Sequence, residues 1–174
     1  MKTNTTCFIG HRKINETEDL KIRLWDLIEN LILEHNVTTF LFGSKSAFNS
    51  LCEKTLIKAK EKYPHIKRIY VRAEYPYIDD EYKKYLLQFC DETYFPEILV
   101  NAQKSSYVQR NYDMINKSDF CVFYFSEQEA PTTRKSGAKV ALDYAIKRNK
   151  KIFNLAIKQK RTTNGRPYNV HQTP

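Results

Sequence analysis

Short apolar runs alternate along this chain with longer segments in which apolar residues recur every three or four positions. The runs at 5–9, 38–42, 66–71, 93–95, 120–125 and 152–155 have the length and composition of buried strands. The segments between them predict helices at 17–35, 46–62, 80–90, 105–117 and 137–148. This alternation is typical of a parallel sheet that is covered by helices.

We therefore predict an α/β fold, a Rossmann-like, doubly wound and mostly parallel sheet with helices on both faces, because right-handed crossovers join parallel strands. Ligands bind such sheets at the carboxyl ends of the strands, near the point where the strand order reverses. Neither a repeat nor a linker interrupts residues 1–157, so we expect them to form one domain. Residues 158–174 lack an apolar period and contain basic but no acidic residues, which indicates a basic C-terminal tail.

The net charge of +9 indicates anionic partners. Lys158, Lys160, Arg161 and Arg166 belong to the tail, where a role in solubility is favoured over specific binding of nucleic acid. No apolar stretch approaches the roughly 20 residues of a membrane span, and the first residues lack the apolar centre of a signal peptide. We therefore expect a cytoplasmic protein without a membrane partner. The scattered cysteines and histidines predict neither a metal site nor a cofactor.

Four segments follow predicted strands at the edge where ligands bind, and the first is Gly10, His11 and Arg12. Gly10 permits a tight turn, and the guanidinium of Arg12 can form paired hydrogen bonds to a phosphate or a carboxylate. The alternative is a solvated loop without a ligand. Because the segment directly follows the first strand, we give the two interpretations equal weight.

The second segment is Gly43, Ser44, Lys45 and Ser46, between the second predicted strand and the next helix. Its backbone amides and two hydroxyls could hold a phosphate or a ribose, while Lys45 would neutralise charge. In the alternative interpretation Ser46 only caps the helix. The spacing matches neither a Walker A loop nor the GxGxxG fingerprint.

The third segment is the pair Arg110 and Asn111, which interrupts the apolar stripe of the fourth predicted helix. We predict that the pair fixes a ribose or supports the neighbouring loops. The alternative, favoured when the segment is taken alone, is an arginine that covers the end of the sheet with its stem. The best candidates to stack on a base are Phe48 and Tyr75.

The fourth segment is Ser136 and Gly137, at the start of the last predicted helix. A helix N-terminus has unpaired backbone N–H groups and a partial positive charge, which suit an anion such as a phosphate. Gly137 would let a ligand approach the backbone. The alternative is simple capping of the helix by Ser136.

Three motifs follow one another along the chain in a specific order and spacing. They are Cys7-Phe8-Ile9-Gly10-His11-Arg12, Arg110-Asn111-x-x-Met114-Ile115 and Ser136-Gly137-x-Lys139-x-Ala141-x-Asp143-Tyr144-Ala145. Together they resemble the SLOG superfamily, in its YpsA/YoqJ-like (DUF1273-type) group, over residues 5–156. The resemblance implies a Rossmann-like fold and the binding of a nucleotide-derived molecule, such as one related to NAD or ADP-ribose. Related proteins often self-associate through their helices, so a homo-oligomer is an open expectation.

The chain departs from the enzymes among these relatives at one position. Those enzymes use a GTxxE helix start, whose glutamate acts on the sugar of the substrate. Counted from Ser136 and Gly137, the glutamate position falls on Ala141, and alanine can neither stabilise nor attack an oxocarbenium ion. Many relatives also have a glycine-rich second loop, whereas this chain has only Gly43 there, which shifts phosphate binding to side chains.

We interpret the chain as a protein that binds or senses a small nucleotide-derived anion without catalysis. One alternative is an enzyme that cleaves N-glycosidic bonds or transfers deoxyribosyl groups, with Asp113, Asp119 or Asp143 as its carboxylate. Another is a protein that binds nucleic acid through its basic tail and surface, for which affinity would fall steeply with salt. The binding protein is favoured over both.

Overall fold

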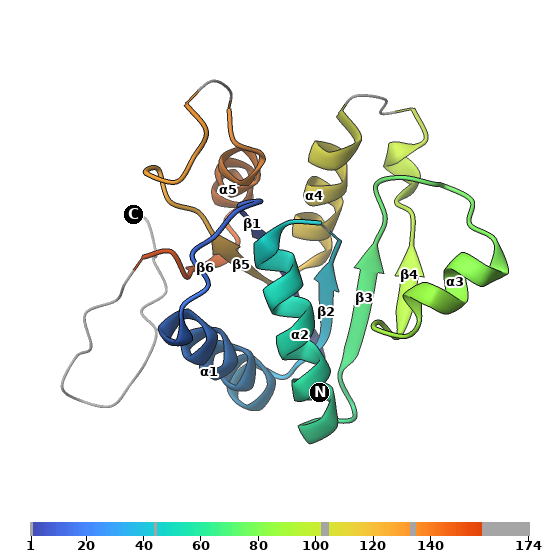
Figure 1. Ribbon diagram of the computed structural model, residues 1–174, viewed down its shortest axis with the longest axis horizontal. Helices are drawn as coiled ribbons and strands as arrows, with labels where there is room; N and C mark the ends of the chain where they lie inside the picture. Colours follow the sequence, from blue (N-terminus) through green and yellow to red (C-terminus); the bar gives the residue numbers. More distant parts are fainter. Residues whose placement is uncertain (1, 44, 102–104, 133–134, 158–174) are drawn as a thin grey trace.

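The computed structural model describes residues 2–43, 45–101, 105–132 and 135–157. The strands are β1 (Asn4–Gly10), β2 (Val37–Phe42), β3 (Lys67–Val71), β4 (Glu92–Tyr94), β5 (Phe120–Tyr124) and β6 (Lys151–Asn154). The helices are α1 (Glu18–His35), α2 (Ala47–Lys62), α3 (Asp80–Leu86), α4 (Ser106–Lys117) and α5 (Gly137–Lys147), with the 3₁₀ turn η1 (Glu97–Leu99) before α4. Strands and helices alternate as the apolar pattern predicts (Figure 1).

All neighbouring strands are parallel, in the order β4-β3-β2-β1-β5-β6. Strands β2, β3 and β4 follow one another on one side of β1, and β5 and β6 lie on its other side. The strand order therefore reverses between β1 and β5, where Gly10 lies opposite Tyr124. A doubly wound sheet opens a crevice at this point, beyond the carboxyl ends of the two strands.

Helices cover both faces of the sheet, and each face has its own apolar core. On one face α1 and α2 cover the sheet (Figure 1). They pack over strand residues such as Phe8 and Phe40, whose rings stack with their centroids 6.0 Å apart. On the other face α4 and α5 contribute Met114 and Ala141 to a cluster that includes Phe123 of β5. The predicted α/β fold with helices on both faces is confirmed, and the sheet is parallel throughout.

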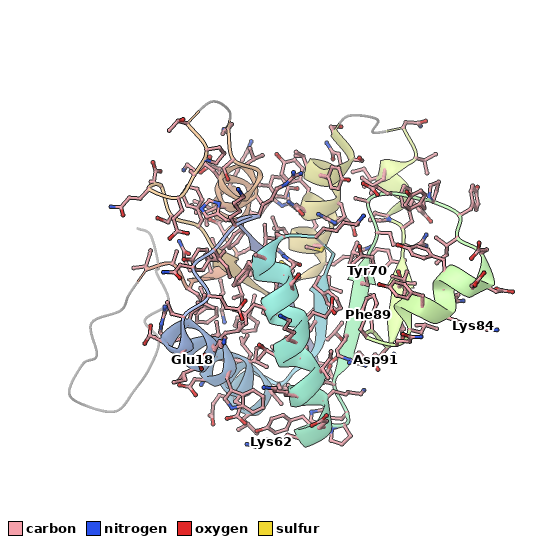
Figure 2. The ribbon with its side chains drawn as sticks, viewed as in Figure 1. Glu18, Lys62, Tyr70, Lys84, Phe89 and Asp91 are labelled. Carbon is pink, nitrogen blue, oxygen red and sulfur yellow. The ribbon has the colours of Figure 1, made fainter. Side chains whose placement is uncertain are left out.

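One helix is shorter than its prediction. The apolar pattern predicts a helix over 80–90, but α3 ends at Leu86, and residues 87–89 form turns. Backbone N–H groups in these turns donate to carbonyls three residues earlier, which tightens the chain. The turns bring Phe89 edge-on against Tyr70 of β3, with ring centroids 6.3 Å apart (Figure 2).

Three side-chain N-caps set where the helices begin. The side chains of Thr17, Ser46 and Asp79 accept a hydrogen bond from the backbone N–H three residues later, at 3.1, 3.1 and 2.7 Å. Thr17 and Ser46 therefore precede α1 and α2 instead of opening them. The predicted tail, residues 158–174, lies outside the described residues. Within the described part of the chain, no helix is long and apolar enough to cross a membrane.

Candidate ligand-binding site

Two neighbouring cavities open at the carboxyl ends of the strands. The larger has a volume of about 480 Å³ and lies between the end of β1 and the start of α5, where the strand order reverses, so we call it the switch-point cavity. Its lining residues are Phe8, Ile9, Gly10, His11, Arg12, Lys13, Asn49, Tyr107, Arg110, Asn111, Glu129, Pro131, Lys135, Ser136, Gly137 and Ala138.

The smaller cavity, of about 220 Å³, lies beyond the ends of β2 and β3, and we call it the tyrosine cavity. Its lining residues are Arg12, Gly43, Lys45, Ser46, Tyr70, Arg72, Ala73, Glu74, Tyr75, Tyr82, Tyr107 and Arg110. Arg12, Tyr107 and Arg110 line both cavities, so the two are adjacent, and we refer to them together as the cleft. Together they fall in the range of about 300–1,000 Å³ that is usual for small-molecule sites.

Positive charge exceeds negative charge along this cleft. Among the described residues, two carboxylates line it, Glu74 and Glu129. The basic residues that line it are Arg12, Lys13, Lys45, Arg72, Arg110 and Lys135. A concave surface with this excess of cations attracts an anionic ligand.

Arg110 of α4 is a buried cation between the two cavities, with only 3% of its surface exposed. Its Nη1 donates to the carbonyl oxygen of Gly43 and lies 3.5 Å from that of Val71, and its Nε donates to Asn111 Oδ1 at 3.1 Å. Within the described part of the chain, no carboxylate forms an ion pair with it. Burial lowers the pKa of Arg110 to about 10, because removing a guanidinium from water disfavours its charged form, and the nearby Tyr70 and Glu74 offset only part of this effect.

These contacts agree with the predicted role of Arg110 in supporting the loops. Its guanidinium ties the end of β2 to the end of β3 and shares a hydrogen bond with Asn111. A Cβ at Gly43 would overlap the carbonyl oxygen of Val71, so Gly43 allows the two strand ends to approach this closely. Arg110 therefore lies under the cleft with part of its surface directed to both cavities.

The start of α5 forms one wall of the switch-point cavity. A Cβ built on Gly137 would meet no atom within 4 Å, so the space in front of the helix N-terminus is open. The Ser136 side chain makes no capping hydrogen bond, although Ser136 occupies the N-cap position. The Ser136 side chain therefore does not cap α5 in this structure, and Ser136, Gly137 and Ala138 at the start of the helix line the cavity.

His11 holds two loops together at the rim of the switch-point cavity. Its Nε2 lies 3.0 Å from both the backbone nitrogen and the carbonyl oxygen of Ser126. Its ring packs against Phe125 at a centroid distance of 5.2 Å. His11 thus joins the segment after β1 to the segment after β5, and the exposed Arg12 follows it into the cleft.

Phe48 does not have the predicted place. Its side chain is fully buried in the core, with its ring centroid 5.7 Å from that of Tyr124. A Cβ at Gly10 would overlap the Phe48 ring, so Gly10 serves the packing of α2 against β1. The prediction that Phe48 stacks on a base is wrong, because neither face of its ring reaches the cleft.

The segment after β2 offers a ligand fewer polar groups than its sequence suggests. The Ser46 hydroxyl accepts from the backbone N–H of Asn49 and caps α2, while Gly43 N–H donates to Asn49 Oδ1 at 3.2 Å. Lys45 is exposed, with its Nζ 4.0 Å from Glu74 Oε2. Ser44 lies outside the described residues.

The tyrosine cavity contains residues that the sequence analysis missed. Tyr75 was a candidate and lies in its wall, 60% exposed, in the left-handed conformation with φ of 58°. Tyr82 packs against it edge-on at 6.3 Å, while Arg72 and Glu74 supply opposite charges. Arg72 directly follows β3, just as the segment containing Arg12 follows β1. This position at the end of a strand could have identified Arg72 from the sequence.

The three aspartates of the alternative enzyme interpretation lie elsewhere. Asp113 accepts from the Tyr94 hydroxyl at 2.7 Å and pairs with a lysine of its own helix. Asp119 accepts from Thr5 N–H before β5 begins, at the opposite edge of the sheet from the cleft. Asp143 pairs with Lys139 of α5 and with Lys135, which precedes the helix. None of the three lines either cavity.

Comparisons with known proteins agree with the fold. No family model matches the sequence, and no curated protein is a significant match. Among solved structures, the molybdenum cofactor carrier protein MCP from Chlamydomonas reinhardtii is similar, with a TM-score of 0.50 and 14% identity, covering 87% of this chain and 75% of that chain. A second structure of the Moco carrier protein of the same organism has a TM-score of 0.49 and 15% identity, covering 90% of this chain and 77% of that chain. At this identity the likeness concerns the Rossmann-like fold alone.

Proposed function

We propose that this protein binds a small nucleotide-derived anion in the cleft formed by the switch-point cavity and the tyrosine cavity. The observation that carries the proposal is Arg110, a buried cation that lines both cavities and forms no ion pair with a carboxylate within the described part of the chain. A buried charge is costly unless an opposite charge compensates it. An anionic group of the ligand would supply that compensation.

The two cavities suit different parts of such a ligand. At the switch-point cavity, the N-terminus of α5 with Ser136 and Gly137 offers backbone N–H groups to a phosphate, and Arg12 and Lys135 add positive charge. The tyrosine cavity offers aromatic rings to a planar group. A nucleotide contains both parts, joined by a sugar that would lie near Arg110 and Asn111.

The resemblance to the SLOG superfamily supports the same class of ligand, molecules related to NAD or ADP-ribose. MCP, which shares the fold, is by its name a carrier of the molybdenum cofactor, so a protein of this architecture that carries a small ligand has a precedent. Binding without catalysis fits Ala141, which is buried in the apolar cluster under α5 and offers no carboxylate. We further propose that residues 1–157 form this binding domain and that residues 158–174 are a basic tail beside it.

The test places a negative charge where the phosphate is proposed to bind. Gly137→Asp puts a carboxylate into open space at a helix N-terminus, a position that favours acids, so the protein should remain folded. We expect calorimetry to show that its affinity for ADP-ribose, or for ribose 5-phosphate, falls at least about tenfold, because two anions would compete for one site. Gly137→Asn has nearly the same shape without the charge and is the matched control.

A second pair of variants separates the cleft from general surface charge. Arg12→Ala should weaken binding by about tenfold, the effect of one lost hydrogen bond between charged groups. Arg148→Ala removes the same charge at the far end of α5, outside both cavities, and should leave the affinity unchanged. Equal affinities of wild type, Gly137→Asp and Arg12→Ala would refute the proposed site.

A further inference from the structure

We propose that the tyrosine cavity selects a guanine-type ring, meaning a planar ring system with the 2-amino-4-oxopyrimidine edge that guanine and pterins share. This inference rests on the proposed function and specifies the group that enters the smaller cavity. It departs from the adenine that a molecule related to NAD or ADP-ribose would present. Three observations carry it: the aromatic wall, the carboxylate of Glu74 and the unpartnered Nε of Arg72.

The size and wall of the cavity fit one planar ring system. Its volume of about 220 Å³ gives room for one planar ring system, and the adjacent switch-point cavity is larger. Tyr75 and Tyr82 pack edge-to-face in its wall, at a centroid distance of 6.3 Å, and Tyr107 contributes from α4. Aromatic side chains hold nucleobases by stacking, with little preference among the bases. Selectivity must therefore come from the polar groups.

Glu74 provides a hydrogen-bond acceptor that is already fixed in place. Its Oε1 accepts from the Tyr107 hydroxyl, and its Oε2 lies 4.0 Å from Lys45 Nζ. A carboxylate has about four lone-pair positions, so most of its accepting capacity remains when Tyr107 is bound. Tyr107 thus acts as a positioning residue, and a ring that presents two adjacent donors can bind both oxygens of Glu74.

Arg72 provides donors and needs an acceptor. Its Nη1 donates to the carbonyl oxygens of Tyr75 at 2.5 Å and Pro76 at 3.4 Å, which holds the loop after β3. Within the described part of the chain, its Nε is buried and has no hydrogen-bond partner. A buried donor without a partner is costly, and a small rotation of the Arg72 side chain would let this donor bind an oxygen or ring nitrogen of a ligand in the cavity.

A carboxylate together with an arginine matches guanine better than adenine. The N1–H and 2-amino groups of guanine are adjacent donors for a carboxylate, and its O6 and N7 are adjacent acceptors for an arginine. Adenine alternates donors and acceptors, a pattern that the amide of Asn or Gln matches. Neither Asn nor Gln is among the described residues that line the tyrosine cavity.

The experiment compares four probes by calorimetry on the full chain: GMP, IMP, AMP and ribose 5-phosphate. IMP differs from GMP only by the absent 2-amino group. We expect GMP to bind most tightly, IMP about tenfold more weakly and AMP about a hundredfold more weakly, because a hydrogen bond to a charged group changes affinity by about tenfold or more. AMP should still bind more tightly than ribose 5-phosphate, because its base keeps the stacking on the tyrosines.

Glu74→Gln tests the carboxylate itself. The amide replaces one acceptor by a donor, so the ratio of GMP affinity to AMP affinity should fall at least tenfold. Glu81→Gln makes the same change at an exposed position of α3 outside both cavities and should leave the ratio unchanged. Unchanged binding of ribose 5-phosphate confirms that the Glu74→Gln protein is folded.

The outcomes separate this inference from the proposed function. If AMP binds as tightly as GMP while both bind more tightly than ribose 5-phosphate, the guanine-type ring is wrong and the proposed function stands. If none of the four probes binds, both are wrong. Guanosine and neopterin present the same edge without a phosphate. The one that competes better with GMP shows whether the cavity prefers a purine or a pterin. Failure of both to compete would overturn the inference.

Discussion

At the scale of single residues, two glycines of the cleft have opposite surroundings. A Cβ on Gly10 would overlap the ring of Phe48, whereas a Cβ on Gly137 would meet no atom within 4 Å. The first glycine therefore allows α2 to pack against β1, and the second leaves the N-terminus of α5 open. The sequence analysis gave Gly10 a tight turn in a candidate binding segment and gave Gly137 a role in ligand approach, and the role of Gly137 remains a proposal.

We expect Gly10→Ala to lower the free energy of unfolding by about 1–3 kcal/mol, because the added methyl group forces a fully buried ring to move. Gly137→Ala should change that free energy by no more than about 0.5 kcal/mol, since its surroundings are open. Urea denaturation of the two variants measures the difference. Equal stability of both would show that Phe48 does not constrain Gly10.

At the scale of residues, prediction from the sequence is limited because helical spacing does not show how deeply a side chain is buried. Helical spacing identified the inward side of α2, but it could not distinguish a Phe48 at the cleft from a Phe48 in the core. Spacing likewise marked Arg110 as unusual without revealing that its guanidinium would hold the ends of β2 and β3. Arg72 and Glu74 were missed because they follow β3 in a loop that has no recognisable motif.

At the scale of elements, the starts of α2 and α5 show how one residue type serves two purposes. Ser46 caps α2 with a 3.1 Å hydrogen bond to Asn49 N–H, and it is buried. Ser136 occupies the equivalent position of α5 without a side-chain cap. The N–H groups at the start of α5 therefore lack that internal acceptor, which leaves them available to an anion.

Ser46→Ala should lower the free energy of unfolding by about 1–2 kcal/mol, the usual effect of a lost N-cap. Ser136→Ala should lower it by less than about 0.5 kcal/mol but should weaken the binding of ribose 5-phosphate. Thermal or urea denaturation gives the stabilities, and calorimetry gives the affinities. A large loss of stability in Ser136→Ala without a loss of affinity would assign Ser136 to the fold.

The apolar pattern predicted the central strands best, because they are the most deeply buried. β5 is buried at every position, and its bounds differ from the predicted run by one residue. α3 was overestimated because the apolar residues after Leu86 continue a helical spacing, while the chain turns so that Phe89 can reach Tyr70. That contact joins distant segments and leaves no mark in local periodicity.

At the scale of the whole molecule, the cleft exists because the strand order reverses between β1 and β5. Arg12 after β1 and Gly137 after β5 line the same cavity, although 125 positions separate them in the chain. Gly43 and Lys45, which flank the undescribed Ser44, line the adjoining cavity. The alternation of strands and helices predicted that these segments lie at one edge of the sheet. Which of them line the same cavity depends on the strand order.

The most direct test of the central claim is a crystal structure of the protein with GMP at a saturating concentration. We predict electron density for the phosphate at the N-terminus of α5, close to Gly137 and on the side of Arg12, with the ring in the tyrosine cavity beside Glu74. Density for the nucleotide elsewhere on the molecule, with both cavities filled only by water, would contradict the account.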